Sequence, residues 1–194
     1  TIASNKIFLA FEKTNWRPTY YTIADPLIWK KIKYKVSNHF STIHIPSYLK
    51  VENLDKILDL KIWQHSHPPD RGRYFSNDCS KVVYGGGTVT FENLQLAVHL
   101  GLNPIYLIGC DHFYKGENPN LKSKVVVHNG ESNHFIENYR SNGEEVFSAD
   151  IDFMNRSYNE TAIFAKKYNI QIINASRKSK LFYFDRCEFS NLFQ

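Results

Sequence analysis

The chain has only three cysteines and one methionine among its 194 residues, and it has no long apolar run. Cys79, Cys110 and Cys187 are odd in number and widely separated, so they suggest neither a disulfide framework nor a Cys-x-x-Cys metal site. No apolar stretch approaches the roughly 20 residues that span a bilayer, and no segment resembles a signal peptide. We therefore expect a cytoplasmic protein, and any contact with a membrane would be peripheral and at the inner face.

Common nucleotide and metal signatures are also missing. The glycines at 85–87 are not followed by the Gly-Lys-Ser/Thr of a Walker loop, and no G-x-G-x-x-G with a ribose-binding acid follows. The one Asp-x-Asp triplet, Asp150-Ile151-Asp152, stands at a predicted helix start and not at a strand end. His65 and His67 lack a third ligand nearby, which makes a poor zinc site. The sequence therefore predicts no metal site and no cofactor.

The charge balance is basic, with a formal net charge of +5 and a pI near 9.0. Such a balance favours anionic partners such as phosphates and nucleotides. No Lys/Arg run exceeds two residues, and neither a zinc-finger spacing nor an RNP-type aromatic strand accompanies the charge. We do not expect nucleic acid as a partner.

The clearest structural unit runs from Lys81 to Gly109. A strand at 81–84 leads into Gly85-Gly86-Gly87, a helix begins near Thr88 and ends at Gly101, and a continuous apolar strand follows at 104–109. The last strand has the composition of one buried on both faces of a parallel sheet. The order strand, helix, strand is typical of a βαβ unit.

Further elements flank this unit. Strands are predicted at 19–24, 43–45 and 170–173, and helices at 51–63 and 153–168. Residues 1–194 are expected to form a single α/β domain of the Rossmann-like, three-layer type, a GT-A-like variant with a mainly parallel sheet. Because the chain enters an apolar run at once, we expect an earlier N-terminal strand to be missing. The polar stretch at about 115–150 lacks any period and is predicted to be a loop or lid, or else a plain insertion.

Ligands of open α/β sheets bind beyond the carboxyl ends of the strands. Four segments meet this description: Ser4-Asn5, Asp25-Pro26, Gly85 to Thr90, and Asp111 to Tyr114. The glycines would let the backbone approach a phosphate, and Thr88 and Thr90 offer hydroxyls and a helix cap, although a structural turn explains them almost as well.

Two groups compete for the role of general base. His134 lies in the polar stretch and has an imidazole that titrates near neutral pH, although a loop histidine is more often merely exposed. Asp152, with Asp150, precedes the last long helix, where a carboxylate also stabilises the helix N-terminus.

Gly86-Gly87-Thr88-Val89-Thr90-Phe91 and the segment 105–114, together with Asn174-Ala175-Ser176, resemble bacterial surface-polysaccharide proteins of the motility-accessory-factor type. That family also includes archaeal hydroxymethylpterin diphosphokinase-like domains. The same segments are more distantly similar to bacterial sialyltransferases that use CMP-sialic acid.

The resemblance implies roles for particular residues. Asn5 matches an Asn that contacts the nucleotide in the sialyltransferases, and Asp25-Pro26 falls where they have a nucleotide-binding Asn-Pro. Thr88 to Thr90 occupies their nucleotide loop, and Tyr114 matches a Tyr that hydrogen-bonds the departing phosphate. Two departures stand out: the Gly-rich loop expected before Thr1 is absent, and Asp152 stands where the family has its catalytic His.

The implied activity is that of a metal-independent glycosyltransferase. It would bind a nucleotide sugar through Asn5, Asp25, Thr88, Thr90 and the backbone of Gly86 and Gly87, with Asp111 at a strand end, and would use His134, Asp152 and Tyr114 in catalysis. The sugar, sialic-acid-like or another nucleotide-activated kind, would pass to a surface polysaccharide, lipopolysaccharide or protein acceptor, and an oligomer is compatible with this activity. The alternatives are a pterin diphosphokinase-like enzyme and a noncatalytic binding module of a polysaccharide-synthesis complex.

Overall fold

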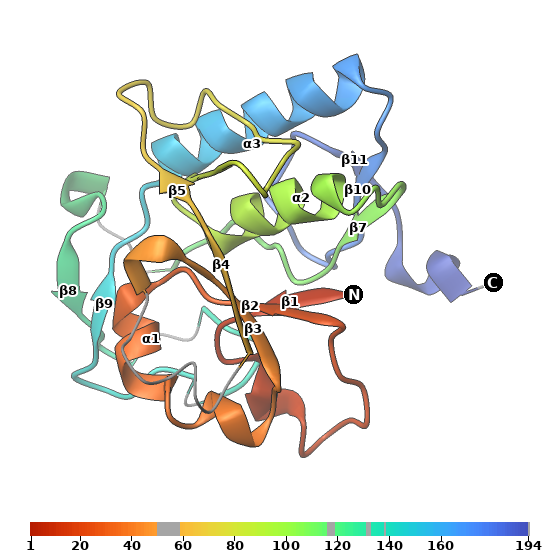
Figure 1. Ribbon diagram of the computed structural model, residues 1–194. Helices are drawn as coiled ribbons and strands as arrows, with labels where there is room; N and C mark the ends of the chain where they lie inside the picture. Colours follow the sequence, from red (N-terminus) through yellow and green to blue (C-terminus); the bar gives the residue numbers. More distant parts are fainter. Residues whose placement is uncertain (50–58, 116–118, 131–132, 138, 194) are drawn as a thin grey trace.

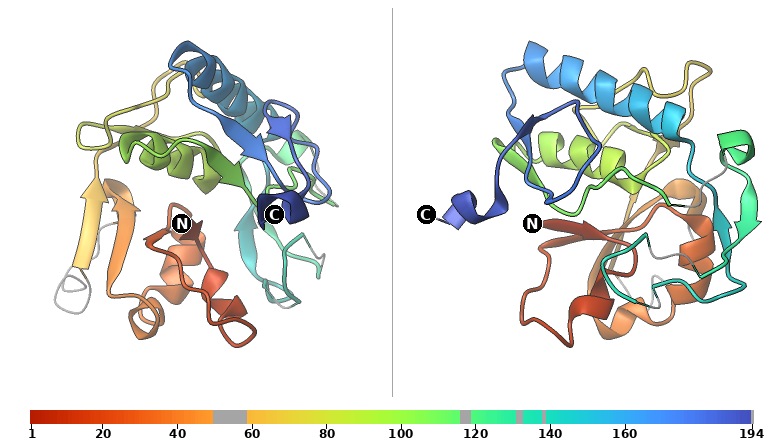
Figure 2. Two further views of the ribbon diagram at one scale, coloured as in Figure 1. Left: turned by 90° about the vertical axis from the view of Figure 1, so that its right-hand side faces the viewer. Right: turned by 180° about the vertical axis from the view of Figure 1, so that it is seen from behind.

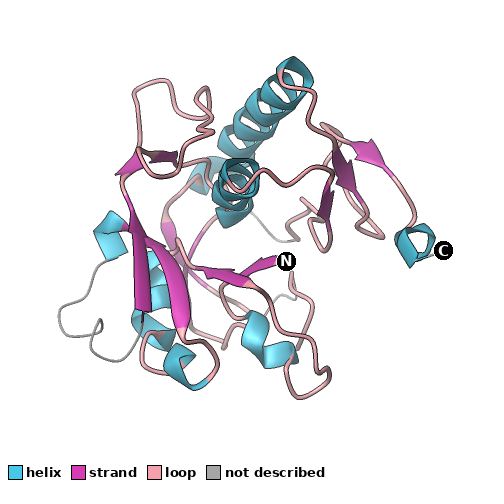
Figure 3. Ribbon diagram, turned by 45° about the vertical axis from the view of Figure 1, so that its right-hand side comes forward, coloured by secondary structure: helices cyan, strands magenta, loops and turns pink. Residues whose placement is uncertain are grey.

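A computed structural model describes residues 1–49, 59–115, 119–130, 133–137 and 139–193. Within these residues the chain is a mixed α/β structure whose strands are mostly parallel (Figure 1). The predicted α/β class is therefore confirmed. The strands fall into four hydrogen-bonded groups, of which the two larger ones are separate in Figure 3, and not into one continuous sheet.

The first group is a parallel sheet in the order β1-β2-β3-β4. Its strands are β1 (Ile2–Ser4), β2 (Tyr20–Thr22), β3 (Thr42–Pro46) and β4 (Asp59–Trp63). Helix α1 (Pro26–Ile32) packs on this sheet through Ile28, Trp29 and Ile32, which lie in one core cluster with Ile43 and Ile45. Short 3₁₀ turns at Ile7–Ala10, Val36–Asn38 and Ser47–Leu49 connect the elements.

Strand β5 (His65–Ser66) follows β4 directly and pairs in parallel with β6 (Val83–Tyr84). The Val83 N–H also donates to the Gln64 carbonyl, so the pairing extends along the link between β4 and β5. Helix α2 (Val89–His99) comes next and contacts both β1 and α3 (Ile151–Lys167); Figure 2 shows it between them. This placement puts the N-terminus of α2 beside the ends of β1 and β2.

Helix α2 has the termini that its sequence predicts. Thr88 caps the N-terminus by accepting the Thr90 N–H through Oγ1. Gly101 follows the helix with φ +72°, and the N–H groups of Gly101 and Leu102 bond back to Val98 and Ala97 in a Schellman pattern.

The second larger sheet is parallel, in the order β11-β10-β7. It consists of β7 (Ile105–Leu107), β10 (Ile172–Asn174) and β11 (Asp185–Arg186), and a 3₁₀ turn at Phe189–Phe193 follows it. Helix α3 and the buried side of this sheet share a core cluster that contains Leu107, Tyr158 and Leu181.

Three sequence interpretations were wrong in detail. Residues 59–63 form strand β4 and not the end of a helix, because they pair along their whole length with β3; the rest of that predicted helix, 51–58, lies outside the described residues. Strand β7 is buried on one face only, since Tyr106 and Ile108 are exposed. The polar stretch is not wholly irregular, because β8 (Val125–Val127) pairs antiparallel with β9 (Glu145–Phe147), after a 3₁₀ turn at Pro119–Leu121.

Two further expectations concern cysteines and membranes. Cys79, Cys110 and Cys187 are free thiols. No helix in the described ranges combines the length and the apolar character that crossing a bilayer requires.

Candidate functional site

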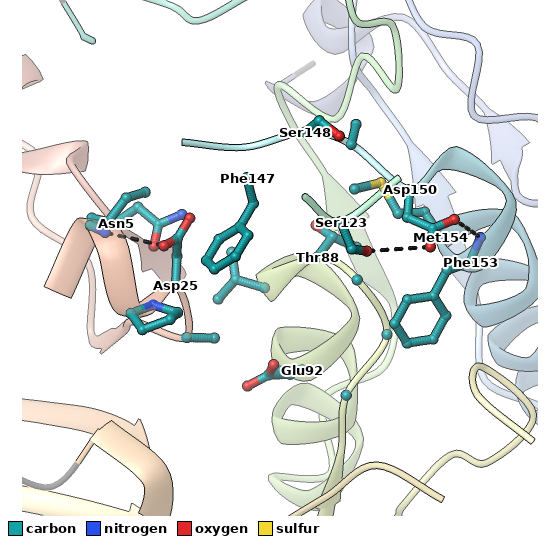
Figure 4. A pocket seen from close by; sticks show the side chains of 18 of the residues that line it. Asn5, Asp25, Thr88, Glu92, Ser123, Phe147, Ser148, Asp150, Phe153 and Met154 are labelled. Atoms are coloured by element: carbon teal, nitrogen blue, oxygen red, sulfur yellow. Dashed lines mark hydrogen bonds between the residues drawn. The ribbon is translucent and has the colours of Figure 1, made fainter. Parts of the chain in front are cut away.

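A cavity of about 630 Å³ lies where the N-terminal sheet, helix α2 and the polar stretch meet (Figure 4). Its volume falls in the roughly 300–1,000 Å³ range of small-molecule sites. Figure 4 shows Asn5 and Asp25 on one side of the cavity and Thr88, Ser123, Asp150 and Met154 on the other.

The structure brings together seven of the ten predicted site residues. The cavity is lined by Asn5, Asp25, Gly86, Gly87, Thr88, Tyr114 and His134. These residues are spread over 130 positions of the sequence, so only the fold joins them. Thr90, Asp111 and Asp152 do not belong to the lining.

Asn5 and Asp25 lie at the ends of neighbouring parallel strands. Asn5 has φ 56°, in the left-handed region that Asn tolerates, and its N–H donates to the Thr22 carbonyl. Its side-chain Oδ1 is buried and has no hydrogen-bond partner in the described structure. Asp25 is the N-cap of α1, accepting the N–H groups of Leu27 and Ile28 at 2.8 and 3.1 Å. One oxygen of Asp25 is thus occupied in holding α1.

Close neighbours leave no room for a side chain at any glycine of the triplet. A Cβ at Gly85 would lie 2.2 Å from the His67 ring, and one at Gly86 would lie 2.2 Å from the Phe91 ring. Gly87 has φ +76°, and a Cβ there would lie 2.9 Å from Phe153. The turn therefore requires glycine for packing, and it also brings bare backbone to the cavity at the N-terminus of α2, where anions are stabilised.

His134 enters the cavity from the polar stretch. Its ring stacks on that of Tyr139 with 3.9 Å between centroids. Burial and then the nearby positive charge of Arg140 lower the pKa of His134 to about 4. The imidazole is consequently neutral at pH 7 and can accept a proton.

Tyr114 lies beside Met154 of α3. Its hydroxyl donates to the Met154 sulfur at 3.3 Å. Asp150 also lines the cavity and caps α3 by accepting the Phe153 N–H at 3.1 Å, while its other oxygen accepts the Ser123 hydroxyl at 3.3 Å (Figure 4). The cap thus ties α3 to the polar stretch.

The three residues outside the lining have other contacts. Asp152 is exposed and forms an ion pair with Lys122, which lowers the pKa of its carboxyl. Asp111 is exposed and its carbonyl accepts the Lys180 N–H, whereas Thr90 hydrogen-bonds with Cys110 and Tyr158. In α3, the N-cap Asp150 faces the cavity and Asp152 points to solvent, because successive helical residues are turned by about 100°.

The sequence analysis did not select three charged residues that line the cavity: Arg71, Glu92 and Arg140. Arg71 lies near the glycine turn, since its guanidinium covers the Phe153 ring at 4.1 Å. Glu92 is only 5% exposed although it carries a carboxyl group. The signal in the sequence was a glutamate one turn inside a helix whose other buried residues, apart from Gln95, are apolar.

Within the described residues, no group of three or more His, Cys, Asp or Glu side chains is placed to hold a metal ion. None of the family models, characterised proteins or solved structures with which the chain was compared matches it.

Proposed function

We propose that this chain is a nucleotide-sugar-dependent glycosyltransferase with a Rossmann-like, three-layer arrangement of the GT-A-like kind. The observation that carries the proposal is the meeting of Asn5, Asp25, the glycine turn, Tyr114 and His134 in one cavity at the N-terminus of α2. A helix N-terminus and bare glycine backbone suit a phosphate, and Arg71 and Arg140 add positive charge at the rim.

The chemistry is a displacement at the anomeric carbon. An acceptor hydroxyl forms the new C–O bond while the bond from that carbon to the phosphate oxygen breaks. Neutral His134 takes the hydroxyl proton, and the nucleotide leaves with the electron pair. Tyr114 and the N–H groups of the glycine turn stabilise the charge that develops on the phosphate. Arg71 supplies charge that a divalent metal supplies in other transferases.

The resemblance to surface-polysaccharide proteins and sialyltransferases suggests the substrates. The donor is a sialic-acid-like or other nucleotide-activated sugar, and the acceptor is a surface polysaccharide, lipopolysaccharide or protein made at the cytoplasmic side of the membrane. Asp152 is not part of this mechanism, because its carboxylate is exposed and paired with Lys122.

The test is a thermal-shift screen of the full-length protein against CMP-, UDP-, GDP- and ADP-linked sugars, followed by an assay for nucleotide release. We expect one nucleotide class to raise the Tm and its sugar to be slowly hydrolysed. A shift with ATP and Mg²⁺ but with no nucleotide sugar would favour the diphosphokinase-like alternative. Binding without nucleotide release, even with a glycan acceptor present, would favour a noncatalytic module.

A further inference from the structure

Glu92 lines the cavity, and only one of its two carboxyl oxygens has a hydrogen-bond partner among the described residues. Its Oε1 lies 3.4 Å from His65 Nε2, while its Oε2 is buried and has no hydrogen-bond partner among the described residues. Figure 4 shows the side chain extending from α2 toward the side of the cavity that carries Asp25. The carboxylate is thus fixed at one oxygen and unpartnered at the other.

His65 holds Oε1 in a tightly packed setting. The His65 side chain is 2% exposed, and its ring packs edge-on against Tyr48 at 4.9 Å and against His67 at 4.4 Å. A Cβ at Gly85 would lie 2.8 Å from the His65 ring, so glycine at this position leaves room for the histidine. The geometry of Glu92 is therefore imposed by several elements and is not a free rotamer.

Such an arrangement does not serve stability. Burial raises the pKa of the Glu92 carboxyl, so the ionised form is disfavoured where it stands. A buried oxygen without a partner is destabilising, and native proteins keep very few of them. Glutamate at 92 is better explained by a ligand group that completes its hydrogen bonds.

The ligand group must be a hydrogen-bond donor. Asn5 Oδ1 is a second buried acceptor without a partner, and Asn5 lines the same cavity. A hydroxyl both donates and accepts, so it can bond to Asn5 Oδ1 and to Glu92 in either protonation form, whereas an ionised phosphate oxygen only accepts and does not match Asn5 Oδ1. Glu92 stands four residues after the Thr88 cap, about 6 Å along the helix. A phosphate bound at the helix N-terminus and a hydroxyl of the sugar ring bonded to that phosphate are separated by about the same distance.

We propose that Glu92 Oε2 hydrogen-bonds with a hydroxyl of the sugar ring bonded to the nucleotide phosphate. This inference rests on the proposed function and extends it by assigning a sugar-hydroxyl subsite to the floor of the cavity. The ring is either the transferred sugar or the ribose, and the experiment separates these two sources.

The experiment measures Kd by calorimetry for CMP-, UDP-, GDP- and ADP-linked sugars and for the free nucleotides, with the full-length protein. Glu92→Leu removes both carboxyl oxygens and keeps a side chain of similar volume, whereas Glu92→Gln keeps one oxygen. Glu160→Gln is the matched control, because it changes another partly buried helical glutamate that lies outside the cavity. Melting curves of all variants establish that each is folded.

We expect Glu92→Leu to raise Kd about tenfold or more, Glu92→Gln to raise it less, and Glu160→Gln to leave it unchanged. If Kd rises only for the nucleotide sugar, the hydroxyl belongs to the transferred sugar. If Kd rises equally for the free nucleotide, the hydroxyl belongs to the ribose. Unchanged or tighter binding by folded Glu92→Leu would overturn the inference while leaving the proposed function intact. If the wild-type protein binds no nucleotide, the proposed function fails, and this inference fails with it.

Discussion

Lys6 and Glu144, which are 138 residues apart in sequence, form an ion pair with 3.3 Å between Nζ and Oε1. Lys6 Nζ also donates to the Tyr139 carbonyl at 2.6 Å, and Lys31 Nζ lies 3.0 Å from the same Glu144 oxygen. These contacts attach the polar stretch, which carries His134, to the loop after β1. The ion pair therefore helps to close the cavity.

Glu144→Gln is expected to weaken this attachment in a pH-dependent manner. Hydrogen bonds and the charges of Lys31 and Lys6 outweigh burial and lower the pKa of Glu144 to about 2. Since an unfolded Glu titrates near 4.3, its contribution to stability is complete above that pH and is lost as the pH falls toward 2. Melting curves at pH 7 and pH 3 should show that the Tm of the wild type falls more between these two pH values than the Tm of Glu144→Gln.

Glu145→Gln is the control for this prediction, since its side chain is exposed on the adjacent position of β9. It should leave the pH dependence of the Tm as in wild type. An identical acid profile for wild type and Glu144→Gln would show that the ion pair does not stabilise the fold.

Gly87→Ala should destabilise the protein more than Gly101→Ala. Both glycines have positive φ, where an L-residue costs roughly 1–2 kcal/mol. A Cβ at 87 would also lie 2.9 Å from the buried Phe153 ring, whereas a Cβ at 101 would have no atom within 4 Å. Chemical denaturation measures both free energies of unfolding, and equal losses would contradict the close packing at the turn.

His134 should titrate far below an ordinary histidine. Its pKa of about 4 results from burial and from Arg140, so NMR of the imidazole should show a neutral ring through pH 5. The unfolded chain takes up this proton near pH 6.5, and stability should therefore fall as the pH drops from 6.5 to 4. A midpoint near 6.5 would place the ring in solvent instead.

The same residue is expected to act in transfer. His134→Gln should lower kcat for sugar transfer by about 100-fold, the scale of general-base catalysis, with little change in Kd for the donor. Asp152→Asn is the matched comparison, because its carboxylate is exposed and bound to Lys122. If Asp152→Asn lost kcat while His134→Gln kept full activity, Asp152 and not His134 would be the general base.

Tyr114→Phe should reduce kcat about tenfold or more, because it removes a donor to the developing phosphate charge. The fold should change little, since the aromatic ring remains and the hydroxyl donates to Met154 Sδ, a weak acceptor. Tyr106→Phe, on the exposed face of β7, is the control and should keep full activity. Full activity in Tyr114→Phe would remove this tyrosine from the mechanism.

Local chemistry explains which elements the sequence predicts correctly. The cap at Thr88 and the stop at Gly101 depend on hydroxyl and φ preferences of single residues, so they can be identified without the fold. Strand β4 could not, because Ile62 continues the helical spacing of Leu54, Ile57 and Leu58 in the sequence until pairing with β3 is known. Likewise, the apolar run of β7 does not reveal that only one of its faces is covered.

For the site, the sequence by itself determined that polar and glycine-rich segments follow strands, and parallel strands bring such ends to one edge. That rule selected the segments that carry Asn5, Asp25, the glycine turn and Tyr114, but it also selected Thr90 and Asp111, which do not line the cavity. Tertiary structure decided the rest: it turned Asp152 to solvent and Glu92 into the cavity. The physical reason is that a carboxylate's role depends on which groups surround it, and those groups come from distant parts of the chain.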